Sequence, residues 1–339
     1  MRIALDAMGG DHAPGPIVLG AVKAVRNDPE VRVVLVGDTA QIEPHLADAG
    51  DARSRLEIVH ASQVVTMEES PLLALRKKPD NSISRCWQLL AERKVDAVVS
   101  AGNTGAMVAG GFRLRLFLKN VRRPGIAALM PTLKGPVVIL DVGANVNPKP
   151  EHLFQYGIMG SIFAKHVLGR EAPKIGLMNV GTEDAKGNDL AKETHTLFAG
   201  SHFKESFLGN VEGRDLHKGV ADVIVTDGFV GNVILKVCEG VFEFIMKMTG
   251  KELMTTLQSE KQQGQLALQN LVKRYDYHEA GGAPLLGIDG ICIICHGSSK
   301  ERAIENALAM AANYARVRLN ERIVAEIESN PTLVEDKAD

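Results

Sequence analysis

Six apolar runs of the chain are each followed by a short segment that is rich in glycine, asparagine and small hydroxyl residues. The segments are DAMGGDHAP (6–14), SAGNTGA (100–106), DVGANV (141–146), NVGTEDAKGN (179–188), TDGFVGN (226–232) and HGSS (296–299). Glycine lets backbone N–H groups approach a ligand closely and adopts positive φ angles. Asn, Ser and Thr add neutral hydrogen-bond donors and cap helices. Because a helix N-terminus also presents free N–H groups, this composition predicts a site for phosphate or an oxyanion.

Two of these segments are the strongest candidates for anion-binding turns. SAGNTGA (100–106) stands before the helix-like run MVAGGFRLRLFL, and TDGFVGN (226–232) stands before VILKVCEGVFEFI. One glycine-rich turn by itself is often explained by chain reversal alone. Six of them after separate apolar runs indicate a shared function.

Familiar nucleotide and metal signatures are missing from the sequence. No G-x-x-x-x-G-K-[ST] is present, no G-x-G-x-x-G follows the first apolar run, and no H-E-x-x-H or EF-hand pattern occurs. We therefore expect neither a cofactor nor a metal. The acidic residues of the segments could bind Mg²⁺, but holding loops or capping helices explains them more simply. These residues are Asp6, Asp11, Asp141 and Asp227.

The sequence also lacks a recognisable protein nucleophile. Ser298 follows His296 closely, but nothing resembles the strand–turn–helix elbow that exposes a nucleophilic serine. Several anion-binding segments without such a nucleophile favour direct transfer to a bound oxyanion. Catalysis would then depend on positioning and on electrostatic stabilisation of the transition state.

The apolar runs that precede these segments are typical of buried strands. They are rich in Val, Ile and Leu and nearly continuous, as in parallel strands that are buried on both faces. The expected strands are 2–6, 31–37, 56–60, 95–100, 136–143, 174–181, 221–228 and 290–297. Helix-like stretches at 16–28 and 82–94 lie between strands, and this alternation predicts a doubly wound, largely parallel sheet. In such sheets ligands bind outside the carboxyl ends of the strands, where the six segments stand.

The stretch 231–275 differs from the rest of the chain, because its pattern is helical and amphipathic. Breaks are expected near Gly250 and Gly264, which predicts a helical pair inserted between the last strands. Its apolar residues suit packing in a core or a dimer interface, or contact with a membrane or a partner helix. We expect residues 1–328 to form a single domain and the polar stretch 329–339 to be a flexible tail.

The composition limits the partners and the compartment. A formal net charge of −2 and an aromatic content of 4% argue against nucleic-acid binding. The N-terminal MRIALDAMGG has no apolar signal core, and no stretch reaches the roughly 20 apolar residues of a membrane span. We expect a cytoplasmic protein, in line with four cysteines that form no disulfide framework. Cys292 and Cys295 are expected to be buried on opposite faces of a strand rather than to bind zinc.

Taken together, the six segments and the stretch LLGIDGICIICHGSS resemble the PlsX family of phosphate acyltransferases. The similarity extends from about Arg2 to about Arg322 in the family's order, and TDGFVGN followed by LK and EG is especially specific. The resemblance implies a Rossmann-like three-layer α/β/α fold, similar to isopropylmalate dehydrogenases and phosphotransacetylases. It implies that acyl-[acyl carrier protein] and inorganic phosphate give acyl phosphate and free carrier protein. It also implies a homodimer, peripheral attachment to membranes, and a membrane glycerol-3-phosphate acyltransferase that uses the product in bacterial phospholipid synthesis.

The implied reaction gives the residues of the segments distinct roles. Phosphate is itself the nucleophile, and Lys186 would attract it and balance its charge. Asn232 would donate to phosphate or to the oxyanion, and His296 would move a proton. The other candidates would cradle phosphate, line the site or orient its loops: Asp6, Gly9, Gly10, Asp11, His12, Asn103, Thr104, Gly105, Asn145, Gly181, Asp227, Gly228 and Gly231. Structural alternatives stay open, with Lys186 as a solvated loop lysine, Asn232 as a helix cap, and both histidines as structural residues.

Other functions remain as alternatives. The first is a phosphotransacetylase-like enzyme that uses acyl-coenzyme A, the second a dehydrogenase of similar fold, and the third a non-catalytic membrane scaffold. The missing dinucleotide fingerprint disfavours the dehydrogenase. A basic patch near the site would favour an acidic carrier protein, and its candidates are Arg113, Arg115, Lys119, Arg122 and Arg123. The stretch 247–257 has few large apolar residues, so any membrane contact should be weak and reversible.

Overall fold

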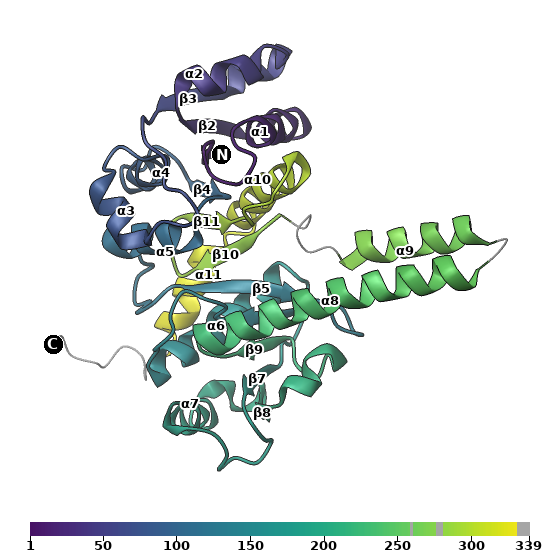
Figure 1. The fold of residues 1–339 in the computed structure, drawn as a ribbon. Coiled ribbons are helices and arrows are strands. Elements are labelled where there is room, and N and C mark those ends of the chain that lie inside the picture. Colours follow the sequence, from purple (N-terminus) through teal and green to yellow (C-terminus); the bar gives the residue numbers. More distant parts are fainter. Residues whose placement is uncertain (258–259, 276–280, 331–339) are drawn as a thin grey trace.

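The computed structural model describes residues 1–257, 260–275 and 281–330. The fold is built on one mixed sheet (Figure 1). The described residues contribute eleven strands in the order β3-β2-β1-β4-β11-β10-β5-β6-β9-β7-β8. Their bounds are β1 Arg2–Asp6, β2 Arg32–Gly37, β3 Leu56–His60, β4 Ala97–Ser100, β5 Gly125–Met130, β6 Val137–Leu140, β7 Ile175–Met178, β8 Phe207–Val211, β9 Val223–Val225, β10 Ala283–Leu286 and β11 Ile291–Ile294.

Every strand that the apolar runs predict is present, although most are shorter than expected. The run 221–228, for example, contributes only Val223–Val225, because Asp227 and Gly228 already belong to the start of a helix. Sequence patterns missed β5, β8 and β10. The missed β10 contains a proline, and β8 contains a glycine and an asparagine, all residues that are depleted in strands.

The sheet is largely parallel, but its polarity changes in the middle. All neighbouring strands pair in parallel except β11 with β10, β10 with β5, and β5 with β6. Strands β1, β4 and β11 therefore run opposite to β6, β7 and β9. As a result, the six glycine- and asparagine-rich segments fall on two edges of the sheet. We call the carboxyl ends of β1, β4 and β11 the first edge, and those of β6, β7 and β9 the second edge.

Helices cover both faces of the sheet, so the predicted three-layer α/β/α fold is confirmed (Figure 1). The helices with residues in the cluster on one face are α1 Gly15–Asn27, α2 Thr39–Ile42, α6 Pro150–His166, α7 Asp189–Ala199, α10 Glu301–Arg316 and α11 Leu319–Glu328. Those on the other face are α3 Pro71–Lys77, α4 Ser82–Ala91, α5 Thr104–Arg113 and the first turns of α8 Gly228–Thr256. Short 3-10 helices are η1 Glu43–Leu46, η2 Gly50–Arg55, η3 His202–Glu205 and η4 Gly213–Lys218. Cys292 and Cys295 are buried in the clusters of opposite faces, as expected for a strand.

The predicted helical pair is present as α8 and α9 (Lys261–Tyr275), which extend away from the sheet together (Figure 1). The break expected near Gly250 is wrong, because this residue lies inside α8. The break expected near Gly264 is confirmed, because α8 ends at Thr256 and α9 begins at Lys261. A Cβ atom on Gly250 would lie 2.9 Å from a methyl carbon of Leu268, so this glycine allows the two helices to approach. The polar turn expected from residue 258 falls partly on residues outside the described part, as does most of the expected tail.

Candidate active site

The first edge brings three of the segments into direct contact. The Asp11 N–H donates to the Gly297 carbonyl oxygen at 2.8 Å, which joins 6–14 to 296–299. A Cβ atom on Gly9 would lie 2.6 Å from the Gly102 nitrogen, so only glycine allows 6–14 to approach 100–106 this closely. His12 and Asp11 are exposed at this edge.

Asp6 lies beneath these segments and not on their surface. Its carboxylate is buried and accepts hydrogen bonds from the Ser100 hydroxyl at 2.7 Å and from the Met8 N–H at 3.2 Å. Burial raises the pKa of the Asp6 carboxyl. The Ser100 hydroxyl oxygen in turn accepts the Gly102 N–H at 3.0 Å. Asp6 and Ser100 therefore fix the backbone of two segments from below.

Asn103 begins α5 and is fully occupied by structural bonds. Its Oδ1 accepts the Ala106 N–H at 3.0 Å, which caps the helix. Its Nδ2 lies 3.2 Å from each of three carbonyl oxygens, those of Thr66, Met67 and Glu69. The side chain thus ties the stretch 66–69 to the start of α5.

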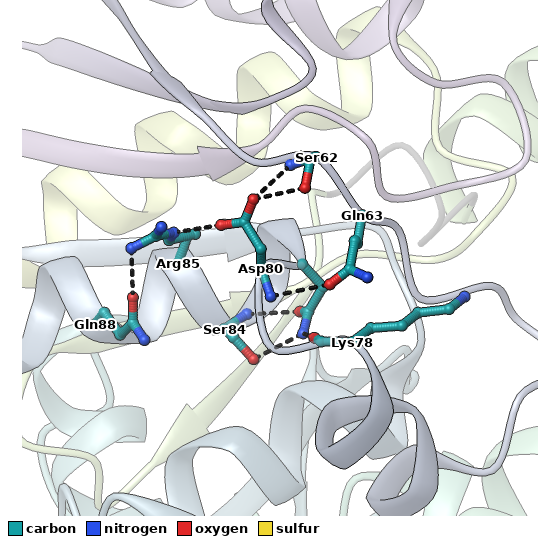
Figure 2. A network of polar contacts seen from close by, with 8 residues as sticks. Ser62, Gln63, Lys78, Asp80, Ser84, Arg85 and Gln88 are labelled. Atoms are coloured by element: carbon teal, nitrogen blue, oxygen red, sulfur yellow. Dashed lines mark hydrogen bonds and ion pairs between the residues drawn. The ribbon is translucent and has the colours of Figure 1, made fainter.

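The residues just before this stretch, Ser62 and Gln63, are held by a polar network around Asp80 (Figure 2). The Asp80 carboxylate accepts the Ser62 hydroxyl at 2.6 Å, the Ser62 N–H at 3.0 Å and Arg85 Nε at 2.8 Å. The bonds from Ser62 and then Arg85 lower the pKa of Asp80 to about 2. Lys78 Nζ adds bonds of 2.7 Å to the Val64 carbonyl oxygen and to the Glu69 carboxylate.

The first turn of α5 keeps its own donors available. Thr104 and Gly105 are exposed, and within the described residues their N–H groups have no hydrogen-bond partner. Two free N–H groups at the positive end of a helix dipole form a site that suits an anion.

The second edge is built around a different buried carboxylate. Asp141 accepts the N–H groups of Ile126, Gly143 and Ala144 at 3.0 Å each and that of Asn145 at 2.7 Å. The Asn145 side-chain amide donates to the Pro124 carbonyl oxygen at 2.7 Å. Both residues therefore hold the loop after β6.

The start of α8 packs against this loop and has no free donors. Asp227 caps the helix by accepting the N–H groups of Phe229 and Val230 at 2.9 Å each. The Gly228 N–H donates to the Asn145 carbonyl oxygen at 2.8 Å, and the Gly231 N–H donates to the Asp227 carbonyl oxygen at 2.9 Å. A carboxylate cap and four satisfied N–H groups make this helix start a poor anion site, unlike that of α5.

The loop after β7 carries Lys186 on the surface. Its side chain is 53% exposed and its Nζ lies 4.0 Å from the Glu183 carboxylate. Gly181 lies under it, because a Cβ atom there would be 3.1 Å from Lys186 Cγ. Asn188 ends this loop by capping α7 through the Ala191 N–H at 3.0 Å. Neither Lys186 nor Gly181 lines the pocket described next.

A pocket of about 400 Å³ connects residues of the two edges. Thr104 and His296 reach it from the first edge, and Asn232 reaches it from the second. This is possible because α8 crosses the face of the sheet from the second edge, over β6 and β5 (Figure 1). The Asn232 amide has no hydrogen-bond partner within the described residues. The His296 Nδ1 accepts the Ser298 N–H at 3.2 Å and lies 2.7 Å from the Ser298 hydroxyl.

Comparison with known proteins identifies the family. Residues 1–322 match the family described as fatty acid synthesis protein. The phosphate acyltransferase of Geobacter sulfurreducens is 45% identical over 336 residues, which cover 98% of this chain and 96% of that protein. That of Heliobacterium modesticaldum is 47% identical and covers 97% of each chain. The chain belongs to the PlsX family of phosphate acyltransferases. It is an acyltransferase of fatty acid and lipid synthesis.

Solved structures agree on the fold of this PlsX chain. A phosphotransacetylase from Streptococcus pyogenes superposes with a TM-score of 0.63 at 17% identity, covering 93% of this chain and 94% of that one. A branched-chain phosphotransacylase from Enterococcus faecalis superposes with a TM-score of 0.54 at 16% identity, covering 96% and 99%. The expected similarity to the phosphotransacetylase fold is therefore confirmed.

The two charged residues of the pocket were not among the predicted site residues. Lys236 and Glu239 line the pocket beside Asn232, and their side chains form an ion pair of 2.8 Å. The signal was present, because both belong to the LK and EG that follow TDGFVGN. Their spacing of three residues on a helix places them side by side. Among the described residues, no three His, Cys, Asp or Glu side chains gather as a metal-binding group.

Proposed function

We propose that this enzyme transfers an acyl group from acyl carrier protein to inorganic phosphate. The observation that carries the proposal is the pocket, which brings Thr104, at the start of α5, together with Asn232, His296 and a largely apolar wall. Phosphate would bind the N–H groups of Thr104 and Gly105 and the Thr104 hydroxyl, because a helix N-terminus favours an anion. The acyl thioester would lie beside it.

The chemistry needs no protein nucleophile. An oxygen of HPO₄²⁻ attacks the thioester carbonyl carbon, a C–O bond to phosphate forms, and the C–S bond breaks. The carbonyl oxygen gains negative charge during the attack, and the Asn232 amide would donate to it. The proton of the phosphate ends on the departing thiolate, so the products are acyl phosphate and the free carrier thiol.

His296 is the proposed proton carrier for this transfer. Because its Nδ1 accepts the Ser298 N–H, the neutral ring carries its proton on Nε2. A phosphate dianion is already abundant near pH 7, since the second pKa of phosphoryl groups is about 6. The histidine therefore has to move a proton and not to create the nucleophile.

The other predicted residues are proposed to attract phosphate or to shape the site. Lys186 would draw phosphate towards the site, and its loose 4.0 Å pairing with Glu183 leaves its long side chain adjustable. The buried and capping contacts of the remaining residues support an orienting role, which we propose for Asp6, Gly9, Gly10, Asp11, Asn103, Asn145, Gly181, Asp227, Gly228 and Gly231. For the exposed His12 we propose that it lines the site.

The thioester carrier is tested by a direct comparison. Purified enzyme, phosphate and hexadecanoyl-[acyl carrier protein] should form an acyl phosphate that hydroxylamine traps, and hexadecanoyl-coenzyme A should react much more slowly. Equal or faster turnover of the coenzyme A thioester would favour the phosphotransacetylase-like alternative. If neither carrier, confirmed to be acylated, gives a product, the proposal fails. The predicted basic patch is weaker support for the carrier protein than this comparison would be. Two of its members already face acidic side chains, since Lys119 pairs with Glu328 at 2.7 Å and Arg122 lies 4.0 Å from Glu151.

We further propose that the enzyme is a homodimer, on the basis of an apolar stripe along α8. The stripe consists of exposed side chains three or four residues apart: Val230, Val233, Val237, Val241, Phe244 and Met248. Residues at this spacing share one helix face, and a second copy of the helix would cover them. An exposed apolar stripe of this kind marks an interaction site.

A cytoplasmic location with peripheral membrane contact is also proposed, so that acyl phosphate can pass to a membrane glycerol-3-phosphate acyltransferase. None of the described helices is long and apolar enough to cross a bilayer. Leu266 on α9 is exposed and could contribute to a weak contact. Sedimentation with anionic phospholipid vesicles tests this, and protein that stays in the supernatant at low salt would contradict it.

A further inference from the structure

The pocket lies where the sheet is incomplete. Strand β10 pairs with β5 only through Leu285 and Leu286, so the part of β5 that contains Ala128 and Leu129 has no β10 residue paired with it. Gly281 and Gly282, the two described residues directly before β10, line the pocket beside Ala128 and Leu129. A gap in a sheet connects its two faces.

Residues from both faces of the sheet indeed line the pocket. Thr104 and Asn232 belong to α5 and α8, which cover one face. Met310 and Tyr314 belong to α10, and Val167 directly follows α6. Helices α10 and α6 cover the opposite face. The pocket is therefore bordered by residues from both helix layers.

The chemistry of the walls changes along this pocket. The α5 and α8 side has polar side chains at Thr104, Asn232 and His296. Within the gap and beyond it the walls include the apolar side chains of Leu129, Ile294 and Met310. Asn313 and Tyr314 of α10 add an amide and a phenol there. An elongated substrate with one polar, reacting end and one long apolar end matches this order.

We propose that the acyl chain of the substrate passes through the sheet at this gap. The thioester lies among Thr104, Asn232 and His296, and the methyl end of the chain lies against Met310 and Val167. This inference rests on the proposed acyl transfer and adds the site that selects the length of the chain.

Met310 is the residue best placed to set that length. It is partly buried against the core of its face and lines the far part of the pocket. A Cβ atom on Gly281, whose φ is +125°, would lie 2.6 Å from Met310 Sδ, so the backbone there forms a close wall. A methionine side chain adapts to its neighbours, whereas a rigid, larger side chain would close the passage.

The first experiment replaces Met310→Trp. We expect kcat/KM for hexadecanoyl-[acyl carrier protein] to fall about tenfold or more, with the value for the octanoyl thioester nearly unchanged, because a shorter chain does not reach the far side. Ala309→Trp is the matched control, since Ala309 is exposed on the same helix and does not line the pocket. An unaltered ratio between the two chain lengths in a folded Met310→Trp enzyme would overturn the proposal.

A second measurement decides the question without any substitution. A hexadecanoyl-[acyl carrier protein] with a photoreactive diazirine at the methyl end is bound without phosphate, irradiated and mapped by peptide mass spectrometry. Labelling within 301–316 supports the passage, whether or not the enzyme turns over. Labelling only on the outer stripe of α8 overturns it. If 301–316 is labelled but no carrier yields acyl phosphate, the passage is supported and the proposed function fails. If acyl phosphate forms but 301–316 is not labelled, the proposed function is supported and the passage fails.

Discussion

At the scale of single residues, the two candidate helix starts differ in their free N–H groups. The sequence motifs at Asn103 and Asp227 look equivalent, since each places a capping residue before a glycine-containing turn. At α8 the cap is a carboxylate and all four N–H groups are bonded. At α5 the cap is neutral, and Thr104 and Gly105 keep their donors. Phosphate recognition is therefore expected at α5.

Thr104→Pro removes the N–H donor and hydroxyl at this position while keeping the helix. Proline is favoured in the first turn, and Asn103 has φ −58° and ψ 110°, a conformation that the residue before proline adopts readily. We expect KM for phosphate to rise about 10- to 100-fold, because this is the range that the loss of one charge-assisted hydrogen bond gives. Thr104→Ala, which keeps the N–H, should have a smaller effect. Equal effects of the two substitutions in steady-state kinetics would argue against backbone recognition.

Asn232 is expected to act in the transition state more than in binding. Its amide faces the pocket and has no protein partner within the described part of the chain, so Asn232→Ala should leave the fold intact. We expect kcat to fall about 10²- to 10³-fold with little change in KM for the thioester, as for loss of one oxyanion donor. Thr249→Ala, at an exposed position of α8 outside the apolar stripe and the pocket, serves as the control. A rise in KM at constant kcat would reduce Asn232 to a binding residue.

At the scale of elements, glycine decides how α8 meets the loop after β6. A Cβ atom on Gly231 would overlap the Asp141 carbonyl oxygen, whereas one on Gly240 would meet no atom within 4 Å. We expect Gly231→Ala to lower the free energy of unfolding by about 1–3 kcal/mol or more, as overpacking does. Gly240→Ala on the same helix should raise it by about 0.5–1 kcal/mol through helix propensity. Chemical denaturation measures both, and equal effects would show that the close approach is not required.

The stability that the contacts of residues 62–69 contribute should depend on the negative charge of Asp80. Its pKa of about 2 is lower than the ordinary value, so the stabilisation is present above about pH 4 and is lost as the pH falls through about 2. Asp80→Asn should therefore lower Tm at pH 5–7, and the difference from wild type should shrink towards pH 2. Glu68→Gln, an exposed carboxylate of the same stretch, is the control. A difference in Tm that does not vary with pH would assign the effect to packing.

At the scale of the whole molecule, the sequence predicts the layers of the fold but not the polarity of its sheet. Continuous Val, Ile and Leu runs identify buried strands such as β2 and β6, yet apolar periodicity carries no information on strand direction. The reversal at β10 and β5 depends on long-range pairing and separates the six segments onto two edges. Thr104, Asn232 and His296 could each be named as candidates from their segments, whereas their meeting in one pocket depends on this reversal and could not be predicted.

The stripe on α8 makes the assembly testable at this scale. Val241→Glu puts a charge in the middle of the apolar stripe, where a second copy of α8 would bury it without a partner. We expect sedimentation velocity to show a dimer for the wild type and a monomer for this variant. Thr249→Glu adds the same charge to an exposed position on another face of α8 and should remain dimeric. A monomeric wild type at micromolar concentration would contradict the dimer. The stripe would then be available for membrane contact, because an exposed apolar helix face of this length binds to the apolar part of a bilayer.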